Sequence, residues 1–362
     1  MRALGLIVAI VAGCGRIGFA PTSDGSIGGD DGTSEPPPNT VFVTRTKYGA
    51  DLGGLMGADD KCKMAADSVG LQGTYVAWLS TTTVDAIDRL AGSRGWVRVD
   101  GTPVLDRVDL GLQTMFNGIL LDETGSAVAG SIRTGTNSIG RKSPACADWT
   151  TTTGNDAING IAEEGIPGFT SGNTGTTCAA MIPIYCFGIG NVATVAPKSA
   201  MVTNPHLIFV SSQPRTTTGI AALDTLCQND VAAASLAGTF RAMVATTTTT
   251  IASRFTSDSR PVVRVDGTVV SPTMSDFLAG NTLSSFANQL TNGTYVGAIK
   301  VWTGATNPTA TGSMAETCNN WNDLTAGLQG AAGNPSGIST LRFWDAYFTN
   351  CSSQLPVFCL QD

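Results

Sequence analysis

Two apolar stretches of the chain, each ending in a polar residue, alternate β-branched and aromatic side chains in the way that predicts a β-strand. Residues 41–44 read Val-Phe-Val-Thr and residues 208–211 read Ile-Phe-Val-Ser, so both are rich in β-branched and aromatic side chains. Further along, apolar residues recur at helical spacing around Cys62 and again around Cys227. The pattern therefore predicts the same order, a strand followed by a helix, in two places.

These two places belong to one long internal repeat. The sequence VGLQGTYVAWLSTTT at 69–83 is closely matched by ASLAGTFRAMVATTT at 234–248. The motif Arg-Val-Asp-Gly-Thr begins at Arg98 and again at Arg264, and a Cys-x-x-Trp motif also occurs twice. A chain of 362 residues is long enough for two domains of ordinary size. The expected bounds are residues 41–188 for the first domain, 189–205 for a connector and 206–362 for the second domain.

The start of the chain has the pattern of a bacterial lipoprotein signal. Arg2 precedes a short apolar run, too short to span a bilayer, and small residues then precede Cys14. We expect a signal peptide over 1–14 and acylation of Cys14, which would anchor the chain to a membrane; an ordinary secretion signal is the alternative. Residues 15–40 are rich in Gly, Ser, Asp and Pro and are expected to be a disordered tether. Because Gly15 is not an aspartate, an outer-membrane or cell-surface location is favoured.

Nine cysteines divide into Cys14 and four in each expected domain. In an exported chain, four cysteines per domain predict two disulfides per domain, although spacing alone leaves several pairings open. A zinc site favours closely spaced cysteine pairs, which are absent from the sequence. We therefore expect disulfides, and neither a metal nor another cofactor.

The charged and polar residues argue against several classes of function. A net charge of −7 leaves no basic field for nucleic acid. His206 is the only histidine and lies at the edge of an expected strand, where a linker role is favoured. The carboxylate pairs Asp122-Glu123 and Glu163-Glu164 lie in glycine-rich loops and are expected to be solvated. No catalytic constellation emerges, so an enzyme is not expected.

The repeated motifs resemble the endostatin domain of collagens, and more closely the bacterial endostatin-like domain of leptospiral surface lipoproteins. The resemblance rests on residues 57–80, on Cys-x-x-Trp at Cys146 and Cys318, and on a closing Cys-x7-Cys in each copy. It implies an α+β, C-type-lectin-like fold in two tandem, disulfide-stapled domains. It also implies a nested pairing of the cysteines: Cys62–Cys186, Cys146–Cys178, Cys227–Cys359 and Cys318–Cys351.

Candidate ligand contacts are few. Trp321, Asn322 and Asp323 spell the Trp-Asn-Asp triplet of calcium-dependent lectins, but the partner loop of those lectins is missing. Trp302 and Trp344 are candidates to stack on a sugar or a protein partner. For the tryptophans, packing in the core is the favoured interpretation, and for Asn322 and Asp323 the opening of a turn.

The expected function is a surface-anchored, non-enzymatic binding or adhesion module for an extracellular protein or glycan. The resemblance points the same way, since the leptospiral relatives are linked to binding host matrix proteins and complement regulators. The alternatives are a structural envelope lipoprotein without a soluble ligand, or a carbohydrate-binding accessory protein. Recognition is expected from four variable loop regions: residues 103–140, 150–177, 269–300 and 322–350.

Overall fold

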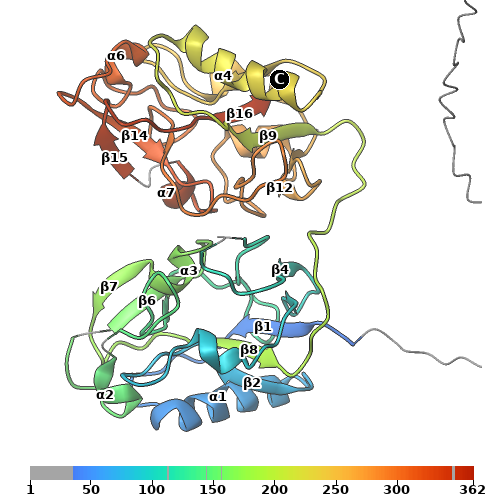
Figure 1. Ribbon diagram of the computed structural model, residues 1–362, viewed down its shortest axis with the longest axis vertical. Coiled ribbons are helices and arrows are strands. Elements are labelled where there is room, and N and C mark those ends of the chain that lie inside the picture. Colours follow the sequence, from blue (N-terminus) through green and yellow to red (C-terminus); the bar gives the residue numbers. More distant parts are fainter. Residues whose placement is uncertain (1–35, 112–113, 144, 156, 345–346) are drawn as a thin grey trace, which may run out of the picture. The chain divides into compact units, whose positions relative to one another are not determined.

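The computed structural model describes residues 36–111, 114–143, 145–155, 157–344 and 347–362 (Figure 1). Cys14, the expected signal peptide and residues 15–35 of the expected tether lie outside these ranges. Residues 36–362 cluster as one compact unit. Within the described ranges, no helix is both long enough and apolar enough to cross a bilayer.

The first half is built on a five-stranded sheet with the order β2-β8-β1-β3-β4. The central strand β1 pairs antiparallel with β8 and parallel with β3. Val41 and Val43 pack into one apolar cluster and Phe42 into another, because successive strand residues face opposite sides of a sheet. The strands are β1 (Asn39–Val43), β2 (Thr74–Ala77), β3 (Trp96–Val97), β4 (Pro103–Leu105) and β8 (Tyr185–Ile189).

Helix α1 (Gly54–Ser68) covers the face of this sheet on which Phe42 lies, and Figure 1 shows it running along β2 and β8. Its buried residues Ala58, Cys62 and Ala66 recur every four positions and form one stripe. Helical spacing around Cys62 therefore predicted this element correctly.

A short 3-10 helix, η1 (Ile87–Leu90), is held against α1 by an ion pair. Arg89 Nη2 lies 2.7 and 2.6 Å from the two carboxylate oxygens of Asp59. The second half repeats this clamp with Arg254 on Asp224, at 2.7 and 2.9 Å. In both halves the aspartate precedes the outer cysteine by three residues. The Arg–Asp clamp is therefore part of the repeated architecture.

A smaller antiparallel sheet, with the order β5-β6-β7, completes the first half. Across β5 and β6, Ile132 lies opposite Gly160 and Arg133 lies opposite Asn159. The elements of this region are β5 (Ser131–Arg133), α2 (Cys146–Trp149), β6 (Ala157–Ile161), α3 (Gly168–Ser171) and β7 (Asn173–Thr176).

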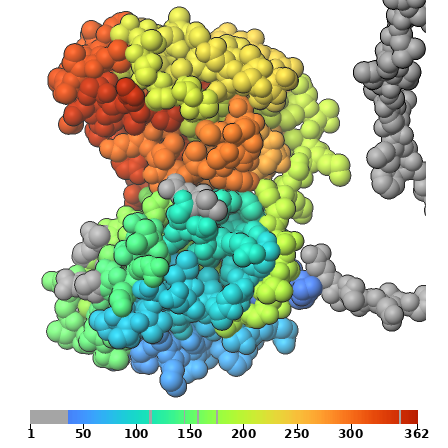
Figure 2. Space-filling model, viewed as in Figure 1, coloured from blue at the N-terminus to red at the C-terminus, as the bar shows by residue number. Residues whose placement is uncertain are grey.

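The second half repeats both sheets, with the orders β10-β16-β9-β11-β12 and β13-β14-β15. On the face shown in Figure 2, the residues of each half form a continuous region of colour. One helix, α5, has no counterpart in the described part of the first half. The elements are β9 (His206–Val210), α4 (Ile220–Ala233), β10 (Phe240–Ala242), η2 (Ala252–Arg254), β11 (Val262–Arg264), β12 (Val269–Ser271), α5 (Met274–Leu278), β13 (Val301–Trp302), α6 (Cys318–Trp321), β14 (Gln329–Gly333), α7 (Thr340–Phe343), β15 (Tyr347–Asn350) and β16 (Phe358–Gln361).

Four disulfides lie within the halves, and none of them joins one half to the other. Each half has an outer bridge from its long helix to its last strand and an inner bridge nested inside it. The Cα atoms of each pair are 5.4–5.6 Å apart. The pairs are Cys62–Cys186, Cys146–Cys178, Cys227–Cys359 and Cys318–Cys351, which is the nested pattern that the resemblance implies.

Loops of the two halves also contact each other within the compact unit. The Arg264 guanidinium donates to the carbonyl oxygen of Phe116 at 2.8 Å. The Gly165 amide donates to the carbonyl oxygen of Ser336 at 2.7 Å. Phe116, Gly165 and Ser336 all fall in the loop regions expected to bind a ligand. Part of each of these regions is therefore committed to contact between the halves.

Candidate functional site

The tryptophans considered as ligand contacts are core residues. Trp302, Trp321 and Trp344 are each 0% exposed. The Trp302 and Trp321 rings meet edge to face at 5.9 Å, and Trp344 meets Phe343 at 4.6 Å. Because a fully buried ring cannot stack on a sugar or a partner, the stacking alternative for Trp302 and Trp344 is wrong, and the favoured core-packing interpretation holds for all three tryptophans.

Asn322 and Asp323 open a turn. The Asp323 carboxylate accepts a 2.6 Å hydrogen bond from the Thr325 amide, and this bond lowers the pKa of Asp323. The Asn322 side chain donates to the carbonyl oxygen of Asn320 at 3.3 Å. No group of three or more His, Cys, Asp or Glu side chains that could hold a metal occurs within the described ranges. The triplet therefore forms local turn contacts.

The two Cys-x-x-Trp motifs, α2 and α6, are left-handed turns. The φ angles of Cys146, Ala147, Asp148 and Trp149 are 24°, 48°, 55° and 72°. The four corresponding residues of α6 have φ angles of 49°, 55°, 51° and 69°. Left-handed backbone costs a non-glycine residue about 1–2 kcal/mol, so four in succession need strong support from their surroundings. The same unfavourable conformation in both copies shows that it is a feature of the repeat.

The left-handed turn of each half holds a threonine-rich loop, residues 80–83 in the first half and 245–250 in the second; we call it the threonine loop. The Asp148 carboxylate accepts hydrogen bonds from the Thr82 amide and the Thr82 hydroxyl, both at 2.7 Å. In the second half the side-chain oxygen of Asn320 accepts from the Thr247 amide at 2.8 Å. The Trp149 indole donates to the carbonyl oxygen of Ser80 at 2.8 Å. These bonds, with the inner disulfide, supply the support that the backbone requires.

The carboxylates expected to be solvated are mostly buried, which corrects that expectation. Asp122, Glu123 and Glu164 are 3, 9 and 7% exposed. Burial raises the pKa of Glu164, and the nearby Arg342, at 3.1 Å, partly offsets this effect. Each carboxylate has its own structural partner: Asp122 accepts from the amides of Thr124 and Ser126, Glu123 from the Arg45 amide and Glu163 from the Gly130 amide.

His206 is not a linker residue. It is the first residue of β9 and is 0% exposed. Its Nε2 atom lies 3.1 Å from both carboxylate oxygens of Asp258, and its Nδ1 atom lies 3.0 Å from the carbonyl oxygen of Gln361. Desolvation raises the pKa of Asp258, but hydrogen bonds from Arg260 and His206 outweigh it and lower the pKa to about 2. The histidine therefore joins β9 to the loop before β11.

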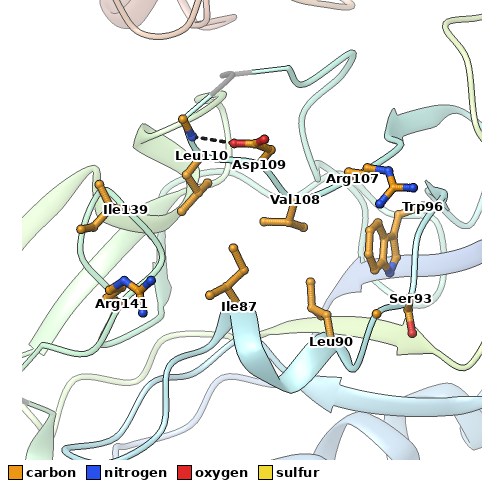
Figure 3. Close-up of a pocket in the computed structure, with 12 residues that line it drawn as sticks. Ile87, Leu90, Ser93, Trp96, Arg107, Val108, Asp109, Leu110, Ile139 and Arg141 are labelled. Atoms are coloured by element: carbon orange, nitrogen blue, oxygen red, sulfur yellow. Dashed lines mark hydrogen bonds between the residues drawn. The ribbon is translucent and has the colours of Figure 1, made fainter.

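A pocket of about 620 Å³ opens in the first half, beside η1 (Figure 3). Ile87 and Leu90 project into it from η1, while Val108 and Leu110 face them from the segment that follows β4. The edge of Trp96 closes one side. This apolar lining is the surface against which the apolar part of a ligand can bind.

Two arginines flank this apolar lining. Arg141 pairs with Asp85 at 2.8 Å, so its charge is partly neutralised. Arg107 is exposed, and no ion pair to it is found within the described ranges. Asp109, on the same segment, accepts a hydrogen bond from the Gly111 amide at 3.0 Å. The pocket thus combines an apolar lining with one guanidinium available to an acidic group.

The corresponding segment of the second half is helical. There the segment after β12 folds into α5, which buries Met274, Phe277 and Leu278. The Thr273 hydroxyl begins this helix by accepting a 2.9 Å hydrogen bond from the Asp276 amide. In the first half, the described part of the segment after β4 forms no helix, and its residues 107–111 line the pocket. These residues and Ile139 lie in the expected loop region 103–140, whereas the rest of the lining lies outside it, and sequence analysis did not single out any of the lining residues.

Comparison with known proteins finds one family model. Residues 212–337 match the family described as a protein of unknown function (DUF1554). The matched stretch lies within the second half and includes α4, α5 and α6. No curated protein matches the chain. The family description names no activity, so the functional argument rests on the site itself.

Proposed function

We propose that this protein is a surface-anchored, non-enzymatic lipoprotein that binds an extracellular protein or glycan. We further propose that each half is an endostatin-like domain with a C-type-lectin-like fold. The support for that fold is a long helix on a mixed sheet, a nested disulfide pair and the repeated Cys-x-x-Trp turn. Lipid attachment at Cys14 and an outer-membrane or cell-surface location complete the proposal.

The observation that carries the binding role is the open pocket beside η1. Apolar side chains line it, an arginine stands at its edge, and the corresponding segment of the second copy folds into the helix α5 instead. A duplicated module whose two copies differ in the segment that lines a pocket has a surface suited to a ligand. The chemistry fits a group with an apolar body and an acidic substituent, such as an acidic side chain on a protein loop or an acidic sugar.

The test uses the full chain, purified with its disulfides formed and screened on arrays of matrix proteins and of glycans. Saturable binding to either class is expected, independent of calcium because the Trp-Asn-Asp triplet forms a turn. Arg107→Glu should weaken that binding about tenfold or more, since a charge reversal opposes an acidic ligand. Arg45→Glu is the matched control, because Arg45 is exposed and lies outside the pocket.

The outcomes separate the alternatives. If the Arg107→Glu and Arg45→Glu variants bind the ligand equally well, the pocket is not the binding site. If the protein binds nothing on either array and is recovered in a stable envelope complex, a structural lipoprotein is favoured. Binding to glycans alone would favour a carbohydrate-binding accessory. Membrane anchoring is tested separately, because Cys14→Ala should release the protein from the membrane fraction.

A further inference from the structure

One buried position differs in chemistry between the two copies. Arg133 in β5 occupies the place that Trp302 occupies in β13, since each stands two residues before the glycine of a Thr-Gly pair. Across the strand ladder, Arg133 lies opposite Asn159, whereas Trp302 lies opposite Ala332. The first half therefore places a cation and an amide where the second half has an aromatic ring and a methyl group.

The Arg133 guanidinium is buried and has no counter-ion among the residues that the structure describes. Arg133 is 0% exposed, and its Nη2 atom donates to the carbonyl oxygen of Ala180 at 2.6 Å. Its Nε and Nη1 atoms are buried and have no hydrogen-bond partner. Burial lowers its pKa to about 10, and no carboxylate offsets that effect. An unpaired buried charge is among the least favourable features of a fold, so this group requires an acceptor.

The other two arginines that are as deeply buried, Arg215 and Arg264, have more partners. Arg264 pairs with the Asp266 carboxylate at 2.9 Å. Arg215 donates to three carbonyl oxygens, those of Cys351, Trp321 and Asp323, and lies over the Trp321 ring. Among the described residues, Arg133 bonds one carbonyl oxygen and no carboxylate. Arg215 also leaves one nitrogen atom, Nε, without a partner, whereas Arg133 leaves two, Nε and Nη1.

Asn159 adds a second group to the same place. It is 0% exposed, its side-chain oxygen has no partner, and its amide nitrogen bonds the Thr176 hydroxyl. Directly opposed residues of an antiparallel ladder have Cβ atoms about 4.5–5.5 Å apart and project from one face. Because a threonine hydroxyl both donates and accepts, the Asn159 amide can turn its NH2 group toward Arg133 and keep its bond to Thr176.

We propose that Arg133 and Asn159 bind a small monovalent inorganic anion, of the size of chloride, inside the first half. The guanidinium offers only donors and one positive charge, and the turned amide adds a further donor. Both residues are fully buried, which favours a small ion over a phosphate ester or a polymer. Trp302 Nε1 is also without a partner among the described residues, but it is neutral and carries no charge for an anion to balance. This site is independent of the proposed ligand pocket.

Bromide is the direct probe. Crystals of the full chain soaked in sodium bromide should show an anomalous peak between the Arg133 guanidinium and the Asn159 amide. The Trp302 position in the same crystal is the internal control and should show none. An ordered water at Arg133 without anomalous signal would overturn the proposal, whatever the behaviour of any variant.

Thermal unfolding gives the second test. At constant ionic strength, chloride should raise the melting temperature above that in gluconate, which is too large to enter. At a chloride concentration 100-fold above the dissociation constant, the expected rise is about 5–10 °C. The double variant Arg133→Trp, Asn159→Ala introduces the residues that the second half has at these positions. Its melting temperature should be the same in chloride and in gluconate. Equal melting of the wild type in both salts, or an unchanged chloride response in the folded variant, would refute the site.

Discussion

Removal of the outer disulfide of the first half should destabilise it more than removal of the inner disulfide. Cys62 and Cys186 are 124 positions apart in sequence, whereas Cys146 and Cys178 are 32 apart. In the chain-entropy model, the longer loop restricts the unfolded chain more. That model gives about 4.9 kcal/mol for the outer bridge and about 3.7 kcal/mol for the inner one at 25 °C. Replacing each pair by alanine removes two buried sulfur atoms, so the packing loss is similar and the difference of about 1 kcal/mol remains.

Urea unfolding followed by tryptophan fluorescence measures this difference, because each half contains three of the six tryptophans. The two bridges of the second half are matched controls, with separations of 132 and 33 positions. They should give the same ranking. If loss of the inner bridge costs more than loss of the outer one in either half, the chain-entropy reasoning fails. The left-handed turn at Cys146 would then be the feature that the inner bridge supports.

Three further predictions concern single side chains. Arg89→Met should lower the free energy of unfolding, measured in urea, by about 1–3 kcal/mol, because it leaves the Asp59 carboxylate without its ion-pair partner. An unchanged free energy of unfolding would show that the Arg–Asp clamp is dispensable. Gly304→Ala should lower the free energy of unfolding by several kcal/mol, because φ is +73° there and a Cβ atom would lie 2.6 Å from the Trp321 ring. A variant as stable as the wild type in the same urea titration would contradict this local geometry. The lowered pKa of Asp258 stabilises the fold above about pH 4 and this contribution is lost as the pH falls to about 2. Asp258→Asn should therefore lower the melting temperature at pH 7 and match the wild type near pH 2, and equal melting at pH 7 would refute the assignment.

The parts of the fold that could be predicted from the sequence are those that depend on local spacing. The alternation of β-branched and aromatic residues in β1 and β9 is a local pattern, and so is the helical spacing of apolar residues around Cys62. Both patterns predicted elements close to their observed positions. The repeat placed the same elements in the second half. The cysteine pairing needed more than spacing, because spacing left several pairings open and the resemblance selected the nested one.

The site depended on tertiary contacts that one sequence does not specify. The pocket beside η1 is lined by the segment from Arg107 to Leu110, which is not helical, whereas the corresponding segment of the second half forms α5 and buries Phe277. Glu164 is buried where it meets the second half, through a bridge to Gly337 and an ion pair with Arg342 of α7. The difference between the copies after β4 and β12 was visible in the sequence, and it is the signal that could have located the pocket.

The left-handed turn at Cys146 has a consequence for how this module can change. Its backbone is tolerable only while the inner disulfide, the Asp148 contact to Thr82 and the Trp149 contact to Ser80 are all in place. These partners lie far apart in sequence, so a chimaera that moves the turn between copies must also move residues 80–83. Mutational drift in this loop, residues 80–83, is thereby restricted by a turn more than sixty residues away.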